Sequence, residues 1–172
     1  MATKTTRRRR AAQTPAERVT INSPSVNRAV DAVLKRVRVD RTFDIPYLAG
    51  YSRAGRTIYI DRHLPKTFSY NGRRIRIDPF MILHEAVEIA LLDKLDLSYH
   101  DAHLIALLAE RSAVEAAGVP WDEYHQMMMA HIKKAGSKKL VRLPRRLNLT
   151  PYLDEQDLDL LQHMLPLMYK QW

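Results

Sequence analysis

The chain has 172 residues, of which 46% are hydrophobic and none is cysteine, and its formal net charge is +9. This length and composition predict one compact domain that buries a core of its own. The absence of cysteine excludes disulfide scaffolds, thiolate zinc sites and cysteine nucleophiles. No apolar run approaches the about 20 residues that span a bilayer, and the first residues are basic, so we expect a cytoplasmic protein without membrane contact.

The basic residues are concentrated in particular segments of the chain. We expect residues 1–22 to form a disordered basic arm, because they are polar and include a run of four arginines. These are Arg7, Arg8, Arg9 and Arg10. The segment Lys133 to Arg146 adds seven basic residues and no acidic one, whereas residues 78–131 hold two basic and ten acidic residues. Both basic segments are suited to non-specific contact with nucleic-acid phosphates, and an ordinary solvated surface is the alternative.

A helix and several short strands are expected before residue 78. Ser23 followed by proline predicts the start of an amphipathic helix that runs to about Arg38. The apolar period then changes to two, and the extended segments are Tyr47–Tyr51, Thr57–Asp61 and Arg74–Ile77. The dipeptide Asn71-Gly72 predicts a hairpin turn.

Alternation within the segment Thr57–Asp61 predicts which side chains are buried. Ile58 and Ile60 point to one face, and Thr57, Tyr59 and Asp61 point to the other. We therefore expect a strand with one exposed face.

A pair of helices is expected next. Asp78-Pro79 begins a helix that ends near Lys94 and is apolar on nearly every side, so it should lie in the core. Ser98, with Asp101 three residues later, predicts a capped second helix that runs to Ala117.

The remaining residues predict further helices and a basic linker. One helix follows Pro120 and ends at Gly136, and Thr150-Pro151 begins a last helix. Pro166 should kink or break that last helix. Residues 137–172 are accordingly expected to form a basic linker and a C-terminal helix.

Three ionisable residues, His84, Glu85 and Glu88, lie within the apolar helix that begins at Asp78. Burying a charge is costly unless the charge is paired or bound to a metal. His84 and Glu88 are four residues apart and share one face, while Glu85 lies on an adjacent face. This spacing predicts two metal ligands beside a further carboxylate.

The following helix offers His100, His103 and Glu110 as a third ligand. In an antiparallel helix pair, residues equidistant from the turn lie opposite each other. With the turn at Asp96, His103 is level with Glu88 and is therefore the predicted third ligand. Glu110 either orients a ligand imidazole or is itself the third ligand in another register, and His100 is the remaining alternative.

The string His84-Glu85-Ala86-Val87-Glu88 resembles the H-E-x-x-H helix of zincin metallopeptidases, with Glu88 at the position of the second histidine. The segment Gly55 to Asp61 precedes it, as an edge strand does in that family, and the resemblance extends from about Ala49 to Gly118. It implies an α+β fold in which a short antiparallel sheet with hairpins packs on an active-site helix and a second ligand-bearing helix, with C-terminal helices added. Residues 23–136 would form this zincin-like domain, and an extended substrate would lie along the edge strand.

The resemblance also implies a chemistry. The gluzincin branch binds zinc with two histidines and one glutamate, and His84, Glu88 and His103 would supply the same set. Glu85 would then act as general base in the hydrolysis of a peptide or protein substrate. Five side chains are available to stabilise an oxyanion, and the sequence does not choose among them: Tyr99, His100, Tyr124, His125 and His131.

Two alternatives remain open at this level. Glu85 and Glu88 could be paired with Lys94 or with arginines of residues 28–77, a segment that holds twelve basic and four acidic residues, without any metal. The chain could also be a catalytically inactive zincin-like module that binds nucleic acid or protein through its basic segments. A di-iron carboxylate bundle is disfavoured, because no glutamate is followed by histidine three residues later.

Overall fold

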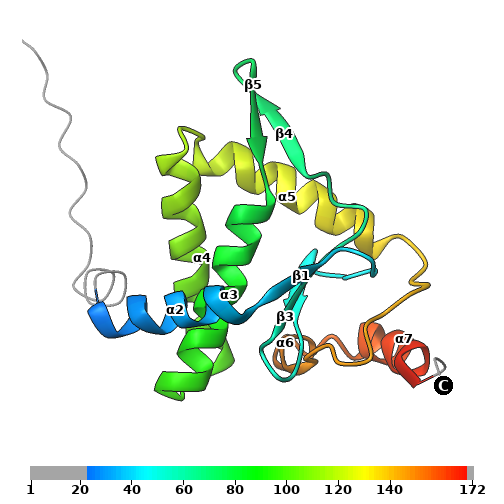
Figure 1. The fold of residues 1–172 in the computed structure, drawn as a ribbon. Coiled ribbons are helices and arrows are strands. Elements are labelled where there is room, and N and C mark those ends of the chain that lie inside the picture. The colour runs from blue at the N-terminus through cyan, green and yellow to red at the C-terminus, as the bar shows by residue number, and fades with distance from the viewer. Residues whose placement is uncertain (1–22, 170–172) are drawn as a thin grey trace, which may run out of the picture.

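The computed structural model describes residues 23–169, and the expected basic arm at residues 1–22 lies outside this range (Figure 1). The described chain is α+β, as expected, with six helices and two small sheets. Its elements are α2 (Pro24–Arg36), β1 (Arg38–Asp40), β2 (Ala49–Tyr51), β3 (Thr57–Ile60), β4 (Thr67–Tyr70), β5 (Arg73–Arg76), α3 (Asp78–Leu95), α4 (Tyr99–Ala116), α5 (Trp121–Gly136), α6 (Thr150–Asp154) and α7 (Leu158–Tyr169).

Helices α3 and α4 form the antiparallel pair on which the rest of the fold is built, and they lie side by side in Figure 1. Proline in the first turn starts α3, and Asp96 ends it in the left-handed conformation, with φ 51°. Ser98 Oγ then caps α4 by accepting a hydrogen bond of 3.1 Å from the backbone N–H of Asp101. These local signals place the turn between the helices at the position that the sequence predicts.

Helix α3 lies in the core, as its composition predicts. Its apolar side chains are buried on several sides, and α2 packs against it through Val30 and Val33. Among the helices of the described chain, none is long and apolar enough to cross a membrane.

The larger sheet has the strand order β1–β3–β2, so β3 is its central strand. Strand β1 pairs in parallel with β3, and β2 pairs with it in antiparallel orientation. The expectation that residues 55–61 form an edge strand is therefore wrong. The parallel pair was not expected either, because parallel pairing joins segments whose contact leaves no local turn signal.

The expectation of one exposed face on β3 is also wrong. Ile58 and Ile60 are fully buried against the helical core, and Tyr59, on the opposite face, is only 6% exposed. Tyr59 packs in a second hydrophobic cluster with Ile45 and with buried residues of the C-terminal segment. The C-terminal segment covers this face of β3, and the alternation of residues within the strand does not indicate such a cover.

Strands β4 and β5 form the predicted hairpin, which projects from one end of the molecule in Figure 1. Asn71 and Gly72 both have positive φ, at 47° and 72°, as a two-residue turn between right-twisted strands requires. A glycine at the second position adopts this conformation without strain.

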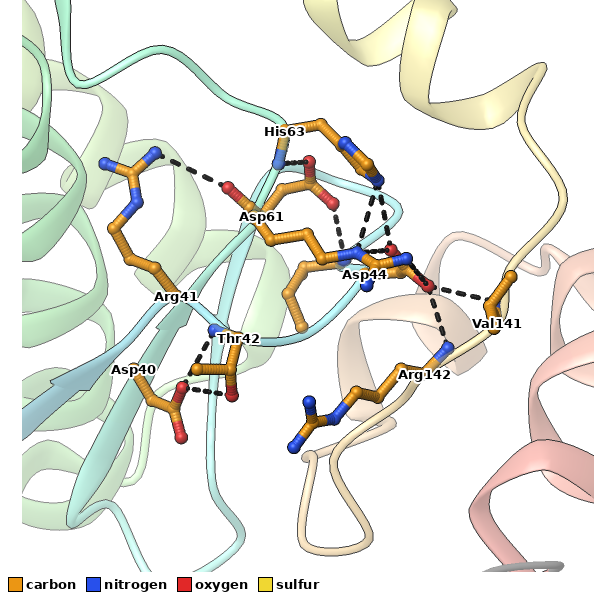
Figure 2. Close-up of polar contacts among 10 residues, drawn as sticks. Asp40, Arg41, Thr42, Asp44, Asp61, His63, Val141 and Arg142 are labelled. Atoms are coloured by element: carbon orange, nitrogen blue, oxygen red, sulfur yellow. Dashed lines mark hydrogen bonds and ion pairs between the residues drawn. The ribbon is translucent and has the colours of Figure 1, made fainter.

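The C-terminal segment is attached to the sheet through Asp44, in the loop after β1. Figure 2 shows Asp44 reaching the segment that joins α5 to α6, where its Oδ2 accepts hydrogen bonds from the backbone N–H groups of Val141 and Arg142 at 2.9 and 2.8 Å. Arg62 donates to the other oxygen of Asp44 at 2.6 Å. The burial of Asp44 opposes ionisation, but these hydrogen bonds outweigh it and lower the pKa of the carboxyl group.

Further along, the same segment runs beside β2. The backbone N–H of Asn148 donates to the carbonyl of Tyr51 at 2.8 Å, and the N–H of Arg53 donates to the carbonyl of Arg146 at 2.8 Å. Gly50 allows this close approach, because a Cβ there would lie 3.2 Å from Cδ1 of buried Leu147.

The sequence predicts one last helix from Thr150 with a kink or break at Pro166, and the structure interrupts this region at another place. Two helices form instead of one, and the interruption lies between Asp154 and Leu158, where Gln156 has φ 55°. Helix α7 is not broken at Pro166, which lies inside it.

Candidate metal centre

His84, Glu88 and His103 come together where α3 faces α4, and this partly buried group could hold a metal ion. His84 Nε2 lies 3.3 Å from His103 Nδ1 and 3.7 Å from Glu88 Oε2. His103 Nδ1 lies 3.1 Å from the same Glu88 oxygen. One turn of α3 supplies two of the groups, and the capped start of α4 supplies the third.

The three separations fit a small divalent cation. With ligand bonds of about 2.0–2.1 Å, the ligand atoms of a tetrahedral zinc site lie about 3.3 Å apart, and the observed separations are close to this value. Two imidazole nitrogens and a carboxylate oxygen are also a usual ligand set for zinc when a fourth position stays open for water or substrate. Little rearrangement of these side chains is needed to hold an ion.

Glu110 lies on the other side of His84 and holds its ring in place. Its Oε2 is 2.9 Å from His84 Nδ1, and its Oε1 accepts a hydrogen bond of 2.8 Å from the Tyr124 hydroxyl. An ionised carboxylate only accepts, so Nδ1 of His84 donates and Nε2 is the nitrogen directed at Glu88 and His103. Of the two roles left open for Glu110, this position matches the one that orients an imidazole.

The charges in this group depend on one another. Burial disfavours the charged form of His84, but its contacts with Glu110 and Glu88 prevail and raise its pKa to about 10. Burial likewise disfavours ionised Glu88, yet the contacts with His103 and His84 lower its pKa overall. The raised pKa of His84 and the lowered pKa of Glu88 favour a protonated His84 beside ionised carboxylates when no metal is bound, and a divalent cation would take the place of that positive charge.

Glu85 is the remaining ionisable residue of this turn, and its side chain lines the pocket next to the group. Burial, and then the nearby negative charge of Glu88, raise the pKa of Glu85 to about 8. Glu85 is only 6% exposed, and no hydrogen bond or ion pair joins its carboxylate to another residue in the range 23–169. A carboxylate in this position is able to exchange protons near neutral pH.

A pocket of about 240 Å³ opens onto the group. A face of α5 lines it through Trp121, Met128 and Ile132, and Ala49 and Gly50 of β2 line it as well. The strand beside the pocket is thus β2, not the segment 55–61 that the sequence pointed to. The C-terminal segment occupies the end of β2 near Tyr51, so the part of the strand that lines the pocket is the part nearer to Ala49.

The other candidate residues are placed differently. Tyr99, Tyr124 and His125 line the pocket, and the Tyr99 ring stacks on His103 with centroids 5.6 Å apart. His100 is exposed and does not join the group, and His131 does not line the pocket.

Pairing with Lys94 or with arginines does not explain Glu88, whose ion-pair partners are His84 and His103. Arginines of residues 28–77 do pair with acidic side chains of residues 78–131 elsewhere. Arg36 pairs with Asp93 at 2.9 Å, and Arg41 pairs with Asp78. These contacts lie on other side chains of the acidic segment and leave the carboxylates of the group to the histidines.

Sequence reasoning missed the residues that the C-terminal segment and β2 bring to the site. Asn148 and Tyr152 line the pocket, and the charge of Glu85 contributes to the raised pKa of Tyr152, after burial. Tyr51 places its hydroxyl near Glu88. Nothing in the local pattern marks these three residues, because their contacts join segments far apart in the sequence.

Comparisons with models of known protein families, with curated proteins and with solved structures found no match. The case for a function therefore depends on the geometry of this site.

Proposed function

We propose that His84, Glu88 and His103 bind one zinc ion and that the chain is a zincin-like, zinc-dependent hydrolase that cleaves peptide or related amide bonds. The observation that carries the proposal is the convergence of three ligand atoms within 3.1–3.7 Å of one another, directly beside the pocket. The adjacent Glu85 and the carboxylate of Glu110 behind His84 complete the arrangement that such a hydrolase requires.

Zinc held by these ligands would lower the pKa of a bound water to about 7 and polarise a substrate carbonyl. Glu85 takes the proton of the attacking water and then gives it to the leaving nitrogen, and its raised pKa suits both steps. Glu110 keeps His84 in the tautomer and orientation that present Nε2. The apolar face of α5 provides the surface against which a substrate side chain can pack.

The test is the cleavage of a peptide mixture by the zinc-loaded protein, with new termini identified by mass spectrometry. Glu85→Gln keeps the side-chain volume and the zinc ligands, and it should lower the cleavage rate by about 10²- to 10⁴-fold. Glu123→Gln, an exposed change in the first turn of α5, is the matched control and should leave the rate unchanged. Cleavage that survives Glu85→Gln or chelation of zinc would refute this mechanism.

A second candidate function is binding of nucleic acid without catalysis. It is favoured by one observation, because all seven basic side chains between Lys133 and Arg146 are exposed. Counterion release makes such binding strongly dependent on salt. This function would be supported if the chain bound nucleic acid and the binding weakened with added salt. The double change Lys138→Glu with Lys139→Glu should also weaken the binding, and Glu85→Gln should leave it unaffected.

A further inference from the structure

Within residues 23–169, one buried side-chain polar atom lacks a hydrogen-bond partner. The hydroxyl of Tyr51, on β2, has no hydrogen bond to any of the described residues, although the side chain is only 5% exposed. Leaving a buried hydroxyl without a partner costs about 1–3 kcal/mol, so such groups are rare and call for an explanation.

Strand β2 holds Tyr51 in a fixed position. Its backbone pairs with Ile58 of β3 on one side, and its carbonyl accepts from the N–H of Asn148 on the other. The side chain packs in the helical core beneath α3. The hydroxyl is thus placed by two neighbouring segments and has little freedom to seek another partner.

The polar side chains that approach this hydroxyl are those of Glu88 and Asn148, and burial and then the negative charge of Glu88 raise the pKa of Tyr51. Both histidine contacts of Glu88 use Oε2. Oε1 of Glu88 is then the oxygen left to accept from a second donor.

We propose that Tyr51 is a positioning residue for the metal centre, whose hydroxyl donates a hydrogen bond to Oε1 of Glu88 once Oε2 is bound to zinc. The inference rests on the proposed zinc site. Binding an ion draws the carboxylate into the orientation that ligation requires, and the hydrogen bond to the second oxygen stabilises that orientation. Tyr51 would act on Glu88 as Glu110 acts on His84, so that α3 receives support from β2 on one side and from α4 on the other.

This assignment predicts opposite effects on the two states of the protein. Without zinc, Tyr51→Phe removes a hydroxyl that makes no hydrogen bond, so stability should be unchanged or higher. With zinc, the same change removes a hydrogen bond to a ligand, and loss of such a partner weakens metal binding by about 10- to 100-fold. If Tyr51 only filled space, Tyr51→Phe would change neither the stability of the zinc-free protein nor the zinc affinity, because phenylalanine retains the ring.

The experiment measures zinc affinity by competition with a chromogenic chelator, and the melting temperature of the zinc-free protein, for the wild type and Tyr51→Phe. Tyr59→Phe is the matched control, because Tyr59 is equally buried but lies on the opposite face of the sheet. We expect Tyr51→Phe to bind zinc about 10-fold more weakly or worse, without a lower melting temperature, and Tyr59→Phe to bind zinc as the wild type does.

A double-mutant cycle identifies the acceptor. In a Glu88→Ala background, whose weaker residual zinc binding is measured at higher zinc concentrations, Tyr51→Phe should cause no further loss of zinc affinity, because the accepting carboxylate is gone. Unchanged affinity of Tyr51→Phe in the wild-type background, or an equal loss in the Glu88→Ala background, would overturn the inference. If the wild type itself bound no zinc, the proposed function would fail. If the wild type and Tyr51→Phe bound zinc equally well, only the inference about Tyr51 would fail.

Discussion

Nδ1 of His84 lies 2.9 Å from Oε2 of Glu110, and this contact determines which nitrogen of His84 faces the other members of the group. Both residues are buried, and Tyr124 occupies the second oxygen of Glu110. The imidazole is thus held by a carboxylate that is itself held by a hydroxyl. Such partners of metal-binding histidines raise the basicity of the ligand and reduce its freedom to rotate.

The first prediction concerns this contact. Glu110→Gln removes the negative charge behind His84 while retaining the shape of the side chain, so zinc affinity should fall by about 10- to 100-fold. Glu115→Gln is the control on the same helix, because Glu115 is exposed and pairs with Arg111. Competition with a chelator measures the zinc affinity of the two variants. Equal zinc affinities would show that Glu110 does not support the metal centre.

A second prediction concerns the attachment of the C-terminal segment through Asp44. Asp44→Asn weakens hydrogen bonds made by an ionised carboxylate, which should cost about 2 kcal/mol of unfolding free energy. This corresponds to a fall in melting temperature of about 4 to 8 °C for a chain of this size. Asp40→Asn is the control, because Asp40 only caps the exposed Thr42. Equal melting temperatures for Asp44→Asn and the wild type would contradict the role assigned to this carboxylate.

The pH dependence of the same variant provides a third prediction. The pKa of Asp44 is lowered in the folded chain, so its contribution is fully present above the unfolded value of about 3.9 and is lost as the pH falls through the folded value. The difference in stability between wild type and Asp44→Asn should therefore be constant from pH 7 to about pH 5 and shrink below about pH 4. Denaturant unfolding of both proteins across this pH range tests the prediction. A stability difference that grew as the pH fell would show that the pKa of Asp44 is not lowered on folding.

A fourth prediction concerns the close approach of Gly50 and Leu147. A methyl group at position 50 would press on Leu147, and overpacking of this kind costs about 1–3 kcal/mol. Gly50→Ala should thus be destabilising in the wild type and clearly less so in a Leu147→Ala background, where the opposing side chain is shortened. Thermal unfolding of the two single variants and the double variant measures the coupling. Strict additivity would mean that the two residues are not in tight contact.

The sequence predicts those parts of this fold that depend on local signals. The first-turn proline of α3, the left-handed Asp96 and the cap at Ser98 define the helix pair, and Asn71-Gly72 defines the hairpin. Helical spacing together with the turn position also brings His84, Glu88 and His103 into one group, because α3 and α4 are adjacent in the chain and joined by a short turn.

Features that depend on long-range packing were not predictable in this way. Tyr59 is buried because the C-terminal segment covers the far face of β3, and no alternation within the strand indicates this. Glu110 contacts His84, although Glu110 lies fourteen residues after the turn at Asp96 and His84 lies twelve before it, a difference of two residues that counting from a turn does not resolve. The unpartnered hydroxyl of Tyr51 likewise follows only from the approach of β2 to α3.

The most direct test of the account is the zinc content of the purified protein after zinc loading and dialysis, compared with His103→Ala, Glu88→Gln and His100→Ala. His100 lies near the start of the same helix as His103 but is exposed and outside the group, so its loss controls for general effects of removing a histidine. We predict about one zinc per chain in the wild type and in His100→Ala, and loss of the ion in the other two variants. A wild-type protein that retains no zinc, or equal zinc in all four proteins, would contradict the proposed metal centre.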